Sequence, residues 1–292
     1  MTDPWKLDWQ ELSLEDRERE YSPSSCIGGN YQSYIRAYAD LSAAARQSHG
    51  QAKLRYGTTE QQTLDLFVPD GVAKPPVLVF FHGGYWQELS KEDSAFAAPQ
   101  CLAHGIAYAA VGYTLAPAAT LSDIVAECRA AVGWLGRLGD TMGIDPDRLI
   151  VVGSSAGAHL AAMTALQTPF GAPGSSPVKG AVLVSGIYDL EPLIGTSIDA
   201  PLGLDPATAA RNSPLHQPLK GFPPSLVCWG EIETDQSKRQ SRAFAQAVHE
   251  AGTDCVEFEN AARNHFDVML DLANPATLLG RRVLALIQST GP

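Results

Sequence analysis

The stretch Leu149-Ile150-Val151-Val152-Gly153-Ser154-Ser155-Ala156-Gly157 decides the fold of this chain. Its first four residues are apolar and predict a buried strand, and the small residues after them predict a sharp turn into a helix. Glycines on both sides of Ser155 suit a strained turn in which the helix passes close to the strand. The pattern is typical of a nucleophile elbow, so Ser155 is the candidate nucleophile and Ser154 a weak alternative.

Two further motifs give the elbow its context. Upstream, the run Val77–Phe81 predicts a strand that ends in His82-Gly83-Gly84-Tyr85-Trp86-Gln87. Glycines there let backbone N–H groups point into a cavity, as an oxyanion hole requires. Downstream, the predicted strand 224–229 is followed by an acidic stretch and later by Asn264-His265-Phe266-Asp267. Glycine loop, serine, acid and histidine follow one another in the order of the α/β-hydrolase fold.

The general base is expected at His265, in a polar stretch between the predicted strand 254–259 and the last helix. From such a loop an imidazole can reach across to the serine. His82 is expected to order the glycine loop. His159, one turn into the helix after Ser155, is expected to point away from a substrate.

The acid that orients the imidazole stays open between two residues. Glu233 stands at the end of the predicted strand and is favoured over Asp235, which lies two residues further on. Glu231, closer to the strand, is expected to face outward. Either candidate would hold the histidine in the right tautomer and stabilise its cation. Tyr85 and Trp86 directly follow the glycines, so at least one of them is expected to line a pocket for a planar substrate.

Composition limits the classes of function. The chain has 292 residues, of which 45% are hydrophobic and 18% charged, so it can bury the core of one large α/β domain. A net charge of −11 argues against nucleic acid and anionic membranes as partners and leaves a small molecule. The chain has no H-E-x-x-H motif or paired-cysteine spacing, so neither a metal nor a cofactor is expected.

Cysteine usage and the first residues indicate the compartment. The five cysteines are scattered and odd in number, and most lie in apolar runs, which predicts buried free thiols and a reducing environment. Residues 1–20 are polar and lack the apolar centre of a signal peptide or a membrane span. We therefore expect a cytoplasmic protein, for which a homodimer would be unsurprising.

The chain divides into an N-terminal segment and a catalytic domain. Residues 1–60 predict helices and loops packed on the core, and residues 61–292 predict a mostly parallel sheet with helices on both faces. Residues 186–224 are rich in proline and lack periodicity, which indicates a lid-like insertion. The predicted strands are 63–69, 76–81, 106–113, 148–153, 179–185, 224–229 and 254–259, and the predicted helices are 91–103, 120–138, 156–167, 237–251 and 274–288.

From about residue 60 to its end, the chain resembles the α/β-hydrolase-fold kynurenine formamidases, or arylformamidases. The likeness rests on four segments: His82–Gln87, Ser155–Leu160, the acid followed by Arg239-Gln240-Ser241, and Asn264-His265-Phe266. Related esterases share the first of these. The chain departs from the family in having Glu233 where an aspartate is usual, and Ser154 where a histidine is common.

The resemblance implies a role for each matched position. It assigns the nucleophile to Ser155, the acid to Glu233 and the base to His265. It assigns the oxyanion donors to the backbone N–H groups of three residues, namely Gly83, Gly84 and Ala156. Phe266, beside the histidine, is expected near the substrate pocket together with the two aromatic residues of the glycine loop.

The expected function is that of a serine hydrolase. We expect it to cleave a small N-formyl arylamine, similar to N-formylkynurenine, or a small ester through an acyl-enzyme. The alternative within enzymes is a general carboxylesterase with a preference for short acyl groups. The alternative from another class is a ligand-binding protein of the same fold without catalysis.

Overall fold

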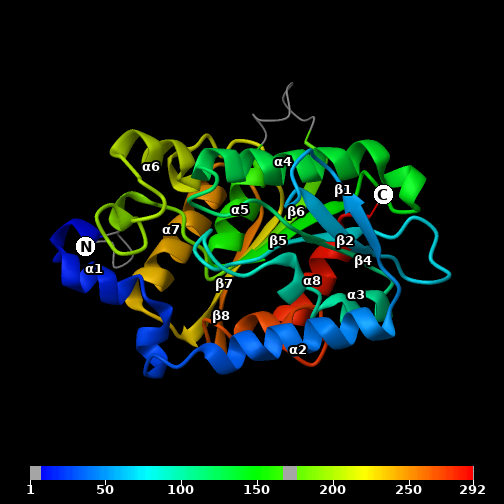
Figure 1. Ribbon diagram of the computed structural model, residues 1–292, viewed down its shortest axis with the longest axis horizontal. Helices are drawn as coiled ribbons and strands as arrows, with labels where there is room; N and C mark the ends of the chain where they lie inside the picture. Colours follow the sequence, from blue (N-terminus) through cyan, green and yellow to red (C-terminus); the bar gives the residue numbers. More distant parts are fainter. Residues whose placement is uncertain (1–7, 167–175, 292) are drawn as a thin grey trace.

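A single sheet forms the centre of the computed structural model, which describes residues 8–166 and 176–291. In these ranges eight strands pair in the order β1-β2-β4-β3-β5-β6-β7-β8 (Figure 1). The strands from β4 through β3 to β8 are parallel, whereas β2 pairs antiparallel with both β1 and β4. The α/β-hydrolase fold predicted from the sequence is thereby confirmed. The strands are β1 (Ala52–Arg55), β2 (Thr63–Phe67), β3 (Val77–Phe81), β4 (Ala107–Val111), β5 (Leu149–Ser154), β6 (Val178–Val184), β7 (Ser225–Ile232) and β8 (Cys255–Asn264).

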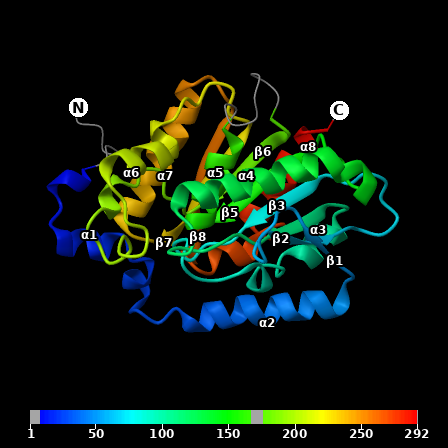
Figure 2. The same ribbon diagram turned by 45° about the horizontal axis from the view of Figure 1, so that its top comes forward.

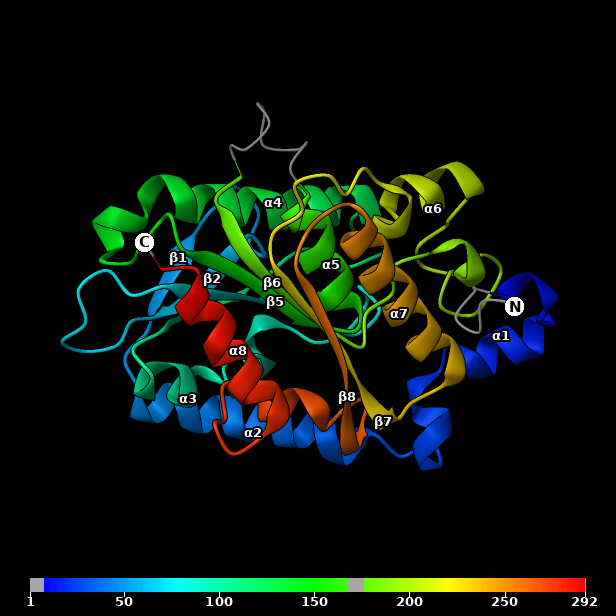
Figure 3. The same ribbon diagram turned by 180° about the vertical axis from the view of Figure 1, so that it is seen from behind.

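Helices cover both faces of the sheet (Figures 1 and 3). Because side chains alternate along a strand, β3 sends Val77 and Val79 to one face and Leu78 and Phe80 to the other. The first face packs against α4 (Leu121–Leu138), α5 (Ala156–Ala165) and α7 (Asp235–Glu250). The second packs against α3 (Ala98–Ala103) and α8 (Leu278–Ser289). All five residues of β3 are buried, which explains its uninterrupted apolar sequence.

The N-terminal segment contains one strand that the sequence did not reveal. Its described part comprises α1 (Leu14–Glu20), the 3₁₀ helix η2 (Pro23–Ile27), α2 (Gln32–Ser48) and β1. Figure 2 shows α2 running along one side of the molecule. The missed strand β1 has four residues, of which only Leu54 is partly buried. A short, exposed edge strand carries too little alternation to be recognised.

The predicted helix 91–103 is wrong as a single helix. The structure has a 3₁₀ turn, η3 (Lys91–Asp93), and then the short helix α3. Lys91 turns inward to pair with the buried Asp65 of β2, with Nζ and Oδ1 2.9 Å apart. The Ser94 hydroxyl donates to the Ser90 carbonyl at 2.7 Å, and Pro99 stands in the first turn of α3. A long-range ion pair therefore replaces the regular helix expected from local pattern.

The insertion 186–224 is folded against the core. It holds the 3₁₀ helices η6 (Glu191–Leu193) and η7 (Pro214–His216), and between them α6 (Pro206–Asn212). Asp205 caps α6 by accepting a hydrogen bond from Thr208 N at 2.6 Å, and Pro206 suits the first helical position. Leu190, Leu193 and Phe222 belong to the core cluster on the α4 face. Of the other predicted helices, 156–167 ends at Ala165 in α5, and residue 167 lies outside the described residues.

Candidate active site

Ser155 occupies a tight turn between β5 and α5. Its backbone has φ +58° and ψ −124°, a conformation that L-residues rarely adopt and that costs on the order of 1–3 kcal/mol. A Cβ on Gly153 would lie 2.2 Å from Gly157 O, and one on Gly157 would lie 2.1 Å from Phe81 O. Both flanking positions therefore admit only glycine, as the sequence pattern predicted. The Ser155 N–H donates to Val184 O at 2.9 Å, which fixes the turn against β6.

The glycine loop passes directly over this turn. A Cβ on Gly83 would lie 2.9 Å from Ser154 O and 3.4 Å from Ser155 Cβ. Gly84 has φ +93°, and its carbonyl accepts hydrogen bonds from the N–H groups of residues 87 and 88, both at 2.9 Å. The glycine loop therefore packs closely against the turn that carries Ser155.

His82 orders the glycine loop through hydrogen bonds and ring stacking, as expected. Its ring stacks on Tyr113 with centroids 4.1 Å apart, and its Nδ1 lies 2.9 Å from Gly83 O. The Tyr113 hydroxyl donates to the carbonyl of His82 at 2.7 Å. Burial lowers the pKa of His82 to about 4, so the ring is neutral at neutral pH and donates through Nδ1.

The structure brings His265 to Glu233 and leaves Asp235 apart. His265 Nδ1 lies 3.0 Å from Glu233 Oε2, and both side chains are buried. Asp235 is exposed at the first residue of α7, and Glu231 is also exposed and accepts a hydrogen bond from Ala262 N. Strand β8 continues to Asn264, so His265 follows a strand directly and the loop expected after residue 259 is absent.

Glu233 accepts hydrogen bonds from four donors. Oε1 accepts from Ser185 Oγ at 2.5 Å and from Gly230 N at 2.6 Å, and Oε2 accepts from Ser237 Oγ at 2.6 Å as well as from His265. Burial by itself raises the pKa of this carboxyl. The charge of His265 and the hydrogen bonds from His265, Ser185 and Ser237 outweigh burial, so the pKa lies below its ordinary value. Glu233 is therefore ionised at neutral pH.

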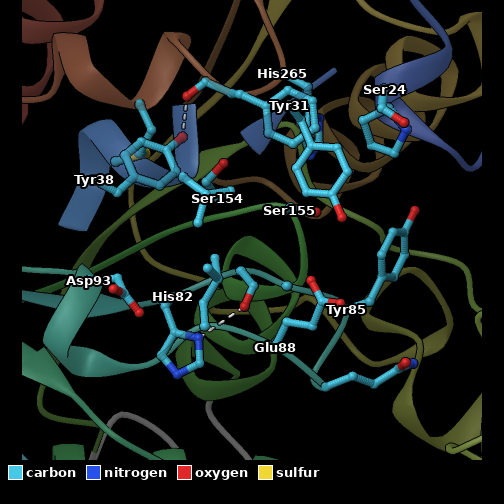
Figure 4. Close-up of a pocket in the computed structure, with 18 of the residues that line it drawn as sticks. Ser24, Tyr31, Tyr38, His82, Tyr85, Glu88, Asp93, Ser154, Ser155 and His265 are labelled. Carbon is cyan, nitrogen blue, oxygen red and sulfur yellow. Dashed lines mark hydrogen bonds between the residues drawn. The ribbon is translucent and has the colours of Figure 1, made fainter. Parts of the chain in front are cut away.

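Ser155 and His265 both border one cavity of about 450 Å³, which the glycine loop also lines (Figure 4). Among the described residues, no hydrogen bond joins the Ser155 hydroxyl to the His265 ring. Bonds of this kind often tighten only when substrate binds. Ser155, His265 and the glycines of the loop therefore border the same small volume.

Aromatic rings form much of the cavity wall. Tyr31 is the N-cap residue of α2 and Tyr38 lies within that helix, Phe266 follows the histidine, and Tyr85 lies in the glycine loop. The insertion contributes Ser197 and Ile198, so both segments outside the core sheet reach the site.

Trp86 does not line this cavity, which corrects the expectation for that residue. It is fully buried, and its indole N–H donates to His159 Nδ1 at 3.2 Å. His159 Nε2 lies 2.7 Å from Asn212 O, so this histidine points away from the cavity, as expected. Tyr85 and Trp86 are adjacent in the same turn, and sequence could not tell which ring faces the cavity.

Several residues of the site carried no sequence signal. Ser185 and Ser237 hold the Glu233 carboxylate but belong to no motif, although Ser237 stands four residues after it, at the helical spacing that makes contact. Tyr31 and Tyr38 belong to no motif either. Tyr31 is the N-cap residue of α2, and Tyr38 lies within the helix seven residues further on.

The cysteines of the chain form no disulfides. All five cysteines are free in the structure, with Cys101, Cys128 and Cys228 buried and Cys26 exposed. Among residues 8–166 and 176–291, no group of three His, Cys, Asp or Glu side chains is arranged to hold a metal ion. In the same ranges no helix has the length and apolar character to cross a membrane.

Comparisons with known proteins assign the family. The model of the family described as BD-FAE matches residues 64–248. A kynurenine formamidase of Danio rerio is 33% identical over 96% of this chain and 98% of its own length, and one of Salmo salar is 31% identical over 91% and 94%. The chain belongs to the α/β-hydrolase family of kynurenine formamidases and esterases.

A further relative and two solved structures are also similar to this chain. Esterase LipQ of Mycobacterium tuberculosis is 28% identical over 72% of this chain and 53% of its own length. A candidate thioesterase from Silicibacter sp. TM1040 superimposes with a TM-score of 0.79 and 27% identity, covering 95% of this chain and 99% of that one. The carboxylesterase EstE1, at a TM-score of 0.68 and 22% identity, covers 91% and 99% and shares the fold.

Proposed function

We propose that this hydrolase cleaves small N-formyl arylamines, similar to N-formylkynurenine, with Ser155 as nucleophile, His265 as general base and Glu233 as the orienting acid. The observation that carries the proposal is the buried His265–Glu233 pair, at 3.0 Å, whose histidine borders the cavity that Ser155 also lines. Similarity to two curated kynurenine formamidases over nearly the whole chain supports the choice of substrate class.

The negative charge of Glu233 sets which nitrogen of His265 acts as the base. Because Glu233 is ionised, it accepts a hydrogen bond from the Nδ1–H group of His265, which keeps the proton on Nδ1 and leaves the Nε2 lone pair free to take the Ser155 proton. Ser155 Oγ attacks the formyl carbon, and the oxyanion is stabilised by the N–H groups of Gly83, Gly84 and Ala156.

Three proton transfers complete the cycle. The protonated His265 donates its Nε2 proton to the leaving aryl amine as the C–N bond breaks, which leaves a formyl ester on Ser155. Water then attacks this ester while His265 removes its proton. The Ser155 oxygen leaves with that proton, and formate is released.

The cavity suits a planar, aromatic leaving group. Its volume of about 450 Å³ lies in the range of small-molecule sites, and the rings of Tyr31, Tyr38, Tyr85 and Phe266 offer flat apolar walls. A formyl group is the smallest acyl group, so the aryl portion of such a substrate supplies most of the contact area.

A short-acyl carboxylesterase is the second candidate, and the 28% identity to Esterase LipQ favours it. Formylated anilines and short-chain aryl esters of matched ring size separate the two on one enzyme preparation. A formamidase turns over both, because the ester has the better leaving group. An esterase leaves the formylated anilines essentially unchanged.

The test of the nucleophile is Ser155→Ala. We expect kcat to fall by roughly 10⁴- to 10⁶-fold, and labelling by a fluorophosphonate probe to disappear. Retention of most activity would refute the assignment of Ser155. Absence of labelling in the unaltered protein would instead favour a ligand-binding protein without catalysis.

A further inference from the structure

The N-terminal segment contacts the glycine loop and the segments that carry the proposed acid and base. In the glycine loop, the Tyr85 hydroxyl donates to the carbonyl of Tyr21. Beside Glu233, the Thr234 hydroxyl donates to the carbonyl of Glu20 at 2.6 Å. The third and most extensive contact is between α2 and the residues around His265. None of α1, η2 and α2 lies in the region matched by the family model, residues 64–248.

Three tyrosines, one at the N-cap of α2 and two within it, contact the residues on both sides of His265. Asn264 Nδ2 donates to the Tyr34 hydroxyl at 3.0 Å, and the Tyr38 hydroxyl donates to the carbonyl of Phe266. The rings of Tyr31 and Tyr34 both stack on Phe266, with centroids 5.3 and 5.8 Å away and interplanar angles of 13° and 19°. The residue before His265 and the residue after it are thus tied to the same helix.

Asn264 links Tyr34 to the turn that contains His265. Its Oδ1 accepts from the N–H of Phe266 at 2.8 Å and from that of Asp267 at 3.1 Å, which closes the turn containing His265. Asp267 returns a hydrogen bond by accepting from Asn264 N at 2.7 Å. The two backbone donors set the orientation of this amide, and Tyr34 restrains its position by accepting a hydrogen bond from Nδ2.

A buried ion network keeps α2 in place. Arg46, in the last turn of α2, lies 3.1 Å from Asp65 of β2 and donates to the carbonyl of Lys91 at 2.6 Å. Lys91 Nζ pairs with the other oxygen of Asp65 at 2.9 Å, and the Asp65 side chain is 1% exposed. The helix is therefore fastened to the central sheet at one end while its tyrosines hold the base at the other.

We propose that α2 is a positioning element for the general base, and that Tyr34 and Tyr38 act through residues 264 and 266 to aim the His265 ring at Ser155. The inference rests on the proposed function, because it assumes that His265 activates Ser155. Tyr34 is a positioning residue. It does not border the cavity, so its hydroxyl acts on the reaction only through Asn264.

Tyr34→Phe is the decisive variant, because it removes the hydroxyl and keeps the ring stacked on Phe266. We expect kcat and the rate of Ser155 acylation by a fluorophosphonate to fall about three- to tenfold, the range expected for one hydrogen bond, with KM within about twofold. Tyr38→Phe, which removes the hydrogen bond to the backbone, should lower the acylation rate at least as much.

Tyr56→Phe is the matched control. The Tyr56 hydroxyl also donates to a backbone carbonyl, Gly112 O at 2.7 Å, but Tyr56 does not border the cavity or contact residues 264–266. We expect it to lower the midpoint of thermal unfolding as the other variants do, with acylation at the wild-type rate. Wild-type acylation in both Tyr34→Phe and Tyr38→Phe would overturn the proposal. A wild-type protein that is never acylated would instead contradict the proposed function.

Discussion

Replacement of Glu233 by glutamine tests the electrostatics of the site. The amide oxygen must stay on Gly230, because that backbone N–H cannot accept a hydrogen bond. The new NH₂ group then faces His265 and Ser237, where the carboxylate had accepted two hydrogen bonds. His265 can accommodate it only by accepting at Nδ1, which moves the ring proton to Nε2. In that tautomer the imidazole cannot take the Ser155 proton.

The expected loss in kcat is roughly a thousand- to ten-thousand-fold, as for removal of the charge of an orienting carboxylate in other serine hydrolases. A misplaced buried donor should also cost about 1–3 kcal/mol of stability at neutral pH. Because folding lowers the pKa of Glu233, its stabilising contribution is complete above the ordinary carboxyl pKa and is lost as the pH falls through the folded value. Glu233→Gln has no carboxylate at this position, so its free energy of unfolding should fall less steeply as the pH is lowered.

Steady-state kinetics on an aryl ester and denaturant unfolding at several pH values measure both effects. Asp235→Asn is the control, since that carboxylate is exposed at the start of α7 and should be almost silent in kcat. Nearly full activity in Glu233→Gln together with a crippled Asp235→Asn would show that the acid has been misassigned.

Two further predictions concern strain and burial. Ser155→Gly should be as inactive as Ser155→Ala but should unfold at a higher temperature than Ser155→Ala. The reason is that glycine relieves about 1–3 kcal/mol of backbone strain at φ +58°. Equal midpoints of thermal unfolding for the two variants would argue against that strain. Burial lowers the pKa of His159 from 6.5 to about 4, so the unfolded chain binds the proton first and the free energy of unfolding should decline as the pH falls from 6.5 to about 4. Urea titrations across this range should show a flatter decline for His159→Gln, and an unchanged slope would mean that the ring is already charged in the folded state.

The elbow and the order of the motifs were predictable because they depend on local requirements. Close packing between β5 and α5 demands glycine at two fixed positions, and this demand is visible in the sequence itself. The end of a parallel strand likewise placed Glu233 within reach of the histidine, and its hydrogen bond to Gly230 depends on a separation of only three residues.

Features that depend on contacts between distant parts of the chain could not be predicted from the sequence. The break in the predicted helix 91–103 comes from Asp65, which is 26 residues from Lys91. The contacts of Tyr34 and Tyr38 with residues 264 and 266 span about 230 positions. Local periodicity contains no information on such pairs, and the choice between Tyr85 and Trp86 for the cavity was lost for the same reason.

The close approach of β5 and α5 has a consequence for engineering the substrate range. Gly153 and Gly157 leave no freedom around the reacting hydroxyl, so its coordinates relative to the sheet tolerate no redesign. Much of the opposite wall is contributed by Ser24, Ile35 and Ile198, which lie outside the packed elbow and the hydrogen-bonded base. Saturation libraries at these three positions can therefore select for substrates of new shapes while the catalytic groups stay unchanged.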